Sequence, residues 1–325
     1  MKKLLKNVVT FTIGFVLFIL IPSLIISTYD NYDKFISVNS NVISLQAKSQ
    51  YDSLDVLFLG SSHCYSSINP KILDSAGIKC YNLGIATAGV EFCDLIINDY
   101  LNNIDKYPRK VFITISPLTF SSASDNFEAY PIHRYLENPV SNFEIAIKYN
   151  HWQRLVMMYK KSIKNGGRNI IKGYFVPLIA FISTKYPNSN FSVKKMKSLD
   201  NKGFIESSVV FSDSIEQKDK YLYQKFNEEQ LNKTIYFDLI KIFQNLMNKG
   251  IDVVFIEIPT NRLSNYFNNL FLSDYENLIN QLGEHAPVIR LDSNKFEKSN
   301  YRNIDHMNNS GAIITTKQII NYLSK

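Results

Sequence analysis

The stretch Asp55-Val56-Leu57-Phe58-Leu59-Gly60-Ser61-Ser62-His63 decides the fold, because a short apolar run ends abruptly in a glycine and two serines. Apolar runs of this length, bounded by turn residues, are typical of strands buried on both faces of a parallel sheet. Gly60 permits a tight turn after the strand, and the two serines then begin a loop. The pattern therefore predicts a hydroxyl group presented at the end of a buried strand, where a nucleophile can act.

Four other short apolar runs, 79–82, 110–115, 252–258 and 288–291, predict further parallel strands buried on both faces. Helical patterns separate most of them. Asn69 and Pro70 begin the first helix, and others are expected over about 89–104, 229–248, 273–282 and 309–323. Strands that alternate with helices predict a three-layer α/β/α sandwich around a mainly parallel five-stranded sheet.

Residues 118–228 interrupt this alternation and contain no clear strand-helix unit. We interpret them as a largely helical insertion. Loops at the carboxyl ends of parallel strands surround the ligand crevice of open α/β sheets, so the insertion is expected to cap the site. The alternative is a surface elaboration with solvated charges. Its aromatic residues, among them Tyr130, Tyr135 and Trp152, can stack on sugar rings, although filling a core is the commoner role.

The amino terminus carries an uncharged apolar run over 8–27, preceded by Lys2, Lys3 and Lys6. This run has roughly the length that crosses a bilayer and is longer than the apolar core of most signal peptides. We therefore expect an uncleaved membrane anchor over 1–28, a stalk over 29–50 and a globular domain over 51–325. The basic residues place the amino terminus in the cytoplasm and the domain on the outer side of the cytoplasmic membrane.

Charge and cysteine content exclude several classes of function. The formal charge of +7 is spread over 325 residues, so no nucleic-acid footprint is expected. Three cysteines, Cys64, Cys80 and Cys93, have a spacing that resembles no zinc ligand set. Cys64 follows Ser62 closely, but a small buried hydrophobic residue is the commoner role for such a cysteine. No phosphate-binding glycine loop or dinucleotide fingerprint is present, and we expect neither cofactor nor metal.

His306 is the expected partner of Ser62. It lies in the block 303–312, after the last predicted strand and before the last predicted helix, and so at the same sheet edge as Ser62. A serine beside a histidine is the arrangement of nucleophilic catalysis. His63 follows the candidate nucleophile and can either contact substrate or be fixed by packing. His133, His151 and His285 are assigned to the surface or to the cap.

With these blocks the chain resembles the SGNH (GDSL-like) hydrolase superfamily, in which the first strand ends in a Gly-x-Ser block and a late block carries the histidine. The resemblance covers 51–325, but its motifs are short. It implies a flavodoxin-like sheet, Ser62 as nucleophile and His306 as general base. It also implies an oxyanion hole formed by the amides of Ser62 and Gly84.

Two departures from the superfamily pattern matter. The usual acid three residues before the histidine is replaced by Asn303, so we rank Asp305 first and Asp292 second as candidates for the acid. Asn303 can hold a histidine tautomer but cannot stabilise an imidazolium with a charge. In addition, the oxyanion-hole asparagine block is missing after the third strand, where Ser116 and Pro117 stand. Ser116 joins His63 as a candidate substrate contact.

The serine-proline block and the basic anchor are similar to those of the membrane-anchored branch of the superfamily, which includes the teichoic-acid D-alanyl transfer protein and polysaccharide O-acetylation proteins. This similarity implies an acyltransferase or esterase outside the cell, with a cell-envelope polysaccharide or teichoic-acid-like acceptor and a membrane-bound O-acyltransferase as partner. The alternative is an inactive protein of the same fold that binds glycan or serves as a scaffold. A single-span receptor is disfavoured by a cytoplasmic tail of only about seven residues.

Overall fold

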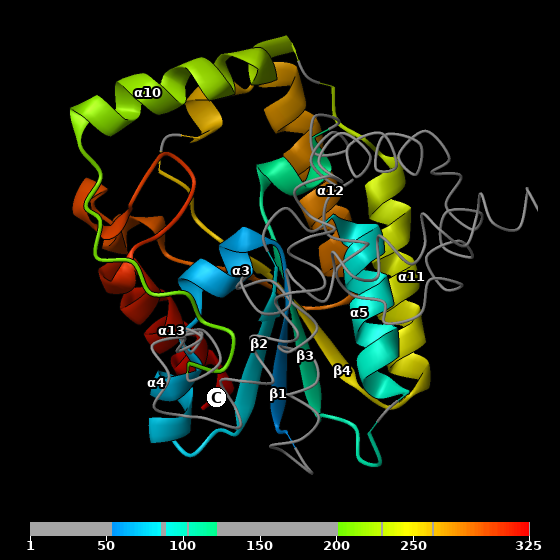
Figure 1. The fold of residues 1–325 in the computed structure, drawn as a ribbon. Helices are drawn as coiled ribbons and strands as arrows, with labels where there is room; N and C mark the ends of the chain where they lie inside the picture. The colour runs from blue at the N-terminus through cyan, green and yellow to red at the C-terminus, as the bar shows by residue number, and fades with distance from the viewer. Residues whose placement is uncertain are drawn as a thin grey trace, which may run out of the picture. The chain divides into compact units, whose positions relative to one another are not determined.

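Five parallel strands form the sheet of this computed structural model (Figure 1), which describes residues 54–85, 89–102, 104–121, 201–228, 230–261 and 263–324. They run in the spatial order β2-β1-β3-β4-β5, the order of flavodoxin-like sheets. The bounds are β1 (Val56–Gly60), β2 (Cys80–Gly84), β3 (Lys110–Ile115), β4 (Asp252–Glu257) and β5 (Val288–Arg290). The predicted α/β fold on a mainly parallel five-stranded sheet is confirmed.

The centre of the sheet is buried on both faces, as its apolar runs predict. β1 lies between β2 and β3, and the side chains of Leu57, Phe58 and Leu59 are wholly buried. Phe58 stacks on Phe112 of β3, with ring centroids 5.2 Å apart. β5 differs from the prediction, because it is a three-residue edge strand whose residues are only partly buried. An edge strand has a neighbour on one side only, so part of it stays in solvent.

Helices cover both faces of the sheet. Figure 1 shows α4 (Pro70–Ser75) and α13 (Asn309–Leu323) on one side, with α5 (Val90–Leu101), α11 (Thr234–Asn248) and α12 (Asn269–His285) on the other. α4 begins as predicted, because the Asn69 side chain accepts a hydrogen bond from the Lys71 amide. α11 buries one stripe at helical spacing, formed by Ile235, Leu239, Ile242 and Leu246. Each of these five helices lies close to its predicted position.

A further helix, α3 (Ser62–Ser67), replaces the loop predicted after β1. Its N-cap is Ser61, whose hydroxyl oxygen accepts a hydrogen bond of 3.4 Å from the His63 amide. Gly60 has a φ of 153°, a conformation that side-chain-bearing residues rarely adopt. Gly60 adopts the unusual backbone conformation, and Ser61 caps the helix directly after it. The chain therefore passes from strand to helix without a loop, and Ser62 is the first helical residue.

The described part of the predicted insertion includes α10 (Asp213–Tyr223) and the 3₁₀ helix η3 (Gln224–Glu228), while 204–212 form no regular element. Figure 1 shows α10 beyond the end of the sheet at which α3 begins. Lys298 ties the start of α10 to the chain before α13, with Nζ 2.6 Å from Asp213 Oδ1 and 3.2 Å from Glu216 Oε2. α10 is therefore anchored on the carboxyl-end side of the sheet.

Several predictions lie outside the described residues. These are the anchor, the stalk, most of the insertion and the aromatic residues Tyr130, Tyr135 and Trp152. Among the helices that the structure does describe, none combines the length and apolar character needed to cross a membrane. The described residues all fall within one compact unit formed by 42–131 and 196–325.

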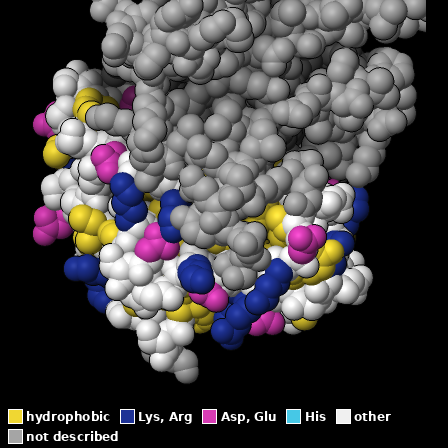
Figure 2. All heavy atoms as spheres, turned by 60° about the horizontal axis from the view of Figure 1, so that its bottom comes forward, with side chains coloured by type: hydrophobic (Ala, Val, Ile, Leu, Met, Phe, Trp, Pro, Cys, Tyr) yellow, Lys and Arg dark blue, Asp and Glu magenta, His cyan; other side chains and the backbone are white. Residues whose placement is uncertain are grey.

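On the face shown in Figure 2, basic and acidic side chains are interspersed with apolar ones. Interspersed charges produce a weaker local field than clustered charges of one sign. The part of this face that is visible therefore presents charges of both signs.

Replacement of Gly60 by Ala tests the turn into α3. The new Cβ atom would stand 1.9 Å from Thr114 Oγ1, so we expect a loss of about 3 kcal/mol in the free energy of unfolding, from strain and overpacking together. Gly77→Ala is the matched control, since it has a φ of 80° but open space around the new Cβ, and should cost about 1–2 kcal/mol. Denaturant unfolding of both variants measures the difference, and equal losses would contradict the proposed crowding.

Candidate functional site

Ser62 and His306 meet at the carboxyl edge of the sheet, although 244 residues separate them. Ser62 is the first residue of α3, directly after β1, and His306 lies in the loop between β5 and α13. The two atoms Ser62 Oγ and His306 Nε2 are 2.7 Å apart, within hydrogen-bonding distance, and both residues are partly exposed. The hydroxyl can therefore donate to the imidazole, which is the geometry of an activated nucleophile.

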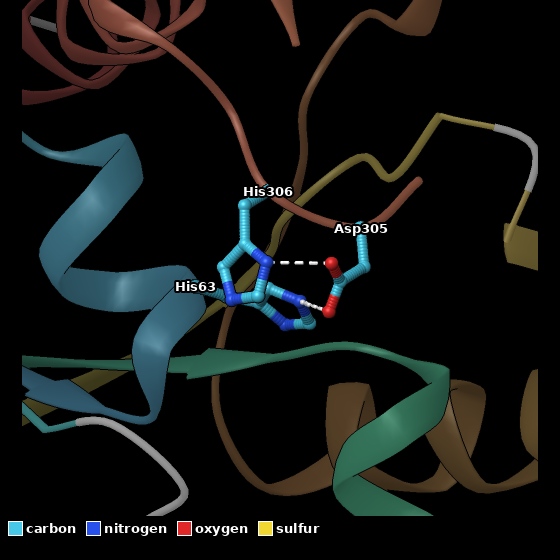
Figure 3. Close-up of side chains that lie close together, drawn as sticks. All are labelled: His63, Asp305 and His306. Atoms are coloured by element: carbon cyan, nitrogen blue, oxygen red, sulfur yellow. Dashed lines mark hydrogen bonds and ion pairs between the residues drawn. The ribbon is translucent and has the colours of Figure 1, made fainter. Parts of the chain in front are cut away.

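Asp305 and Asn303 both lie beside the other ring nitrogen of His306, while Asp292 does not. Asp305 Oδ1 is 2.5 Å from His306 Nδ1, as Figure 3 shows. Asn303 Oδ1 is 3.2 Å from the same nitrogen and also accepts a hydrogen bond of 2.7 Å from the His306 amide. Asp292 instead caps the 3₁₀ helix η5 (Ser293–Lys295) at the surface. Of the candidates for the acid, Asp305 is the one that places a charge against the imidazole.

The surroundings favour a neutral His306 and an ionised Asp305. Burial lowers the pKa of His306 below its ordinary value of 6.5, and this effect outweighs the opposing attraction of Asp305. Burial alone would raise the pKa of the Asp305 carboxyl, but the neighbouring imidazoles of His306 and His63 bring it well below its usual range. At neutral pH His306 is thus able to accept a proton, and Asp305 is able to stabilise the resulting cation.

The His63 and Ser116 side chains are buried behind Asp305. Each is at most 3% exposed. His63 Nδ1 is 2.9 Å from Ser116 Oγ, and His63 Nε2 is 3.4 Å from Asp305 Oδ2. Figure 3 shows that each oxygen of the carboxylate faces a different imidazole ring. The structure therefore places both residues against the candidate acid, and gives neither the open surface that the predicted substrate contact requires.

The same cluster is the group of described residues whose donor atoms could reach one metal ion. His63, Asp305 and His306 each place a donor within 4.8 Å of the others, a convergence that the sequence spacing did not reveal. Two imidazoles and a carboxylate are suitable ligands for a transition metal. However, ligands around a tetrahedral zinc ion lie roughly 3.4 Å apart, given bonds of about 2.1 Å. The 2.5 Å contact between Asp305 and His306 is shorter than this separation.

The amide of Gly84 is not available for the predicted oxyanion hole, because it donates a 2.8 Å hydrogen bond to the side-chain oxygen of Asn82. A Cβ atom at Gly84 would lie 2.5 Å from the amide nitrogen of Tyr65, so glycine at this position serves the close packing of α3 on β2. The prediction for Gly84 is corrected accordingly. The Ser62 amide forms no hydrogen bond within the described part of the chain.

Asn82 was not singled out by sequence reasoning, yet it fixes α3 to β2. It is wholly buried, and its side-chain nitrogen donates hydrogen bonds of 2.9 Å to the carbonyl groups of Cys64 and Ile68. Its oxygen accepts from Gly84. These bonds satisfy the end of a short helix that carries the nucleophile. The signal in the sequence was a polar amide in the middle of the buried run Cys80-Tyr81-Asn82-Leu83-Gly84.

The loop that carries His306 is closed by a second buried asparagine. Asn308 caps α13 by accepting from the amides of Ser310 and Gly311, while its side-chain nitrogen donates to the carbonyl groups of Val209, Ser299 and Tyr301. An isolated bridge pairs Tyr301 with Met307 across the loop. His306 therefore projects from a short loop whose two ends are joined.

All three cysteines are buried free thiols. Burial raises the pKa of the Cys64 and Cys80 thiols far above their ordinary values. A thiol that remains protonated is a poor nucleophile. Cys64 is accordingly a packing residue on the buried side of α3, in agreement with the commoner role expected for it.

No protein-family model and no curated protein matches the chain in sequence. Among solved structures, the chain is similar to the crystal structure of a Bacteroides fragilis protein for which acylhydrolase activity has been suggested. The identity is 10%, the TM-score is 0.35, and the alignment covers 86% of this chain and 90% of the other. A likeness at this level carries no argument about activity, so the function is argued from the geometry of the site.

Replacement of Asn82 by Ala tests the attachment of α3. The change leaves the Ile68 carbonyl and the Gly84 amide without a hydrogen-bond partner among the described residues, and it removes one of the two hydrogen bonds to the Cys64 carbonyl. We therefore expect the free energy of unfolding to fall by about 3 kcal/mol or more. Asn69→Ala, which removes one capping bond at the surface, should cost only about 1 kcal/mol. Denaturant unfolding gives both values, and a loss at Asn82 no larger than that at Asn69 would contradict the assigned role.

Proposed function

We propose that this chain is an acyltransferase or esterase that forms an acyl-enzyme on Ser62. The observation that carries the proposal is the 2.7 Å contact between Ser62 Oγ and His306 Nε2, backed by the Asp305 carboxylate at His306 Nδ1. These contacts supply a nucleophile, a neutral base and a negative charge that stabilises the protonated base. Each group occupies the place that acyl transfer requires of it.

The proposed reaction has two displacements. As Ser62 Oγ forms a bond to the acyl carbonyl carbon, His306 Nε2 takes the serine proton, and Asp305 stabilises the imidazolium. The tetrahedral intermediate then collapses, and the leaving oxygen or sulfur departs with the proton from His306. In the second step His306 deprotonates water or a sugar hydroxyl, whose oxygen attacks the acyl-serine ester. Ser62 leaves with that proton, and the free acid or a new ester is released.

The oxyanion of each intermediate needs donors near Ser62. The Ser62 amide is a candidate, because it has no hydrogen-bond partner among the described residues. Gly84 does not contribute, since its amide is bonded to Asn82. A second donor is expected on substrate binding, because a single hydrogen bond supplies only part of the stabilisation that such sites provide.

The setting of the reaction is proposed from the sequence. The apolar run 8–27 and its basic flank support a membrane-anchored protein with its domain outside the cytoplasmic membrane. The resemblance to the membrane-anchored branch of the SGNH superfamily supports a cell-envelope polysaccharide or teichoic-acid-like acceptor, with a membrane-bound O-acyltransferase as the donor partner. The competing proposal, an inactive glycan-binding or scaffold protein, rests on Asn303 in place of the usual acid.

Active-site labelling tests the nucleophile. The full chain is incubated with a fluorophosphonate and analysed by mass spectrometry. We expect one adduct on Ser62, no adduct in Ser62→Ala, and labelling slowed roughly a thousandfold or more in His306→Ala. Ser75→Ala, which changes an exposed serine on α4, should be labelled at the wild-type rate. A folded wild-type chain that stays unlabelled would favour the inactive scaffold.

The pH dependence of labelling tests the base. Only neutral His306 can accept the Ser62 proton, so the labelling rate should rise with pH as His306 loses its proton. Because burial lowers the His306 pKa, the midpoint of this rise should lie below 6.5. The measurement is the labelling rate between pH 4.5 and 8.5. A midpoint above 6.5 would mean that the attraction of Asp305 outweighs burial.

A further inference from the structure

Two consecutive residues of α3 contact two consecutive residues of the loop before α13. Ser62 pairs with His306, and His63 pairs with Asp305. His63 is buried, and its second ring nitrogen is 2.9 Å from Ser116 Oγ, at the end of β3. Three segments far apart in sequence therefore meet in one chain of polar contacts, which runs from Ser116 through His63, Asp305 and His306 to Ser62.

The chemistry of these groups fixes the direction of the chain. An ionised carboxylate only accepts hydrogen bonds, so the His63 Nε2 that faces Asp305 carries a proton. Its Nδ1 is then an acceptor, and the Ser116 hydroxyl donates to it. On the other side His306 Nδ1 faces the carboxylate, and its Nε2 accepts from Ser62. This arrangement gives each contact in the chain a donor and an acceptor without an added ion.

The position of the acid explains why such support is needed. Side chains of adjacent residues in extended chain point in opposite directions. Here the Asn303 side chain accepts from the His306 amide and curls the loop, which brings Asp305 and His306 to the same side. Asp305 Oδ1 nevertheless has no well-directed hydrogen bond, because its 2.5 Å contact with His306 is off-line. A second group must therefore set the carboxylate's orientation, and His63 touches its other oxygen.

We propose that His63 is a positioning residue, which, itself held by Ser116, fixes the Asp305 carboxylate against His306. The role in catalysis rests on the proposed function, although the contact does not. The 3.4 Å distance between His63 Nε2 and Asp305 Oδ2 is long, and contacts of this kind often tighten when substrate binds. Loss of the His63 donor should free the carboxylate to turn. It also removes a neighbour that lowers the pKa of His306.

Other charged and titratable groups surround this pair. Tyr223 at the end of α10 is a second hydrogen-bonding neighbour of Asp305, and burial together with this carboxylate raises the pKa of its phenol. Arg302, four residues before His306, opposes protonation of His306. These groups are unchanged in the His63 and Ser116 variants, so differences between the variants report the His63 contact.

The test compares His63→Leu, His63→Gln, Ser116→Ala and the matched surface variant His285→Leu in the full chain. Selective ¹⁵N labelling of the five histidines allows the pKa of His306 to be followed by NMR, and fluorophosphonate labelling of Ser62 gives the reaction rate. His63→Leu should lower the labelling rate about tenfold to a hundredfold and raise the His306 pKa by about half a unit. His63→Gln keeps a donor at the Nε2 position and should restore most of both quantities.

Ser116→Ala retains His63 and should show a smaller change in the same direction, while His285→Leu should show none. A general packing defect would reduce the amount of labelled protein without moving the His306 pKa. If His63→Leu does not fold, Ser116→Ala and His63→Gln still test whether His63 positions Asp305. Unchanged His306 pKa values and rates in the folded His63 variants would overturn the proposal.

Two further outcomes separate the alternatives. If the His306 pKa shifts as expected but the wild-type chain is never labelled, His63 positions Asp305 while the proposed acyl transfer is wrong. Labelling in the presence of a metal chelator tests whether a metal ion bridges His63, Asp305 and His306. If a chelator abolishes labelling and Zn²⁺ restores it, the cluster is held together by a metal ion and not by hydrogen bonds. The proposal then fails. We expect labelling to be insensitive to the chelator.

Discussion

The passage from β1 into α3 at Gly60 and Ser61 is the constraint on which the rest of the site depends. Gly60 takes a backbone conformation that other residues rarely adopt, and Ser61 caps the helix at once. With no loop between strand and helix, Ser62 and His63 have fixed positions relative to the sheet. A longer connection would leave their side chains free to move with the loop, and two contacts made by neighbouring residues would be hard to keep.

Buried asparagines support both sides of the site. Asn82 ties α3 to β2, and Asn308 ties the start of α13 to the segments before it. An amide side chain can donate and accept at once, so one residue satisfies carbonyl and amide groups that would otherwise be unpaired in the interior. The cost of breaking such networks is high, which explains how a short helix and a short loop hold a precise geometry.

The electrostatics of the site follow from how differently burial acts on its members. Burial makes His306 less basic, whereas Asp305 stays ionised because it contacts two imidazoles. A neutral base therefore stands next to a negative charge. In the usual arrangement a spacing of three residues brings the acid to the histidine. Here the acid is adjacent to the histidine in sequence, so the loop conformation set by Asn303 and the contact from His63 place the carboxylate against the imidazole.

Local patterns in the sequence determined the strands, most helices and the pairing of Ser62 with His306. Apolar runs, caps such as Asn69, and the placement of both residues beside strand ends require only short stretches of chain and the regularity of parallel sheets. The sequence predicted that β5 is buried on both faces, but its residues are partly exposed. A short apolar run does not show whether a strand lies at the centre or at the edge of the sheet.

Only the tertiary structure decided the side-chain partners. The Gly84 amide is bonded to Asn82, Asp292 caps a 3₁₀ helix at the surface, and Asp305 contacts two imidazoles. His63 and Ser116 faced inward rather than toward substrate. The physical reason is that hydrogen-bond direction and burial depend on groups hundreds of residues apart, which periodicity and spacing along the chain do not specify.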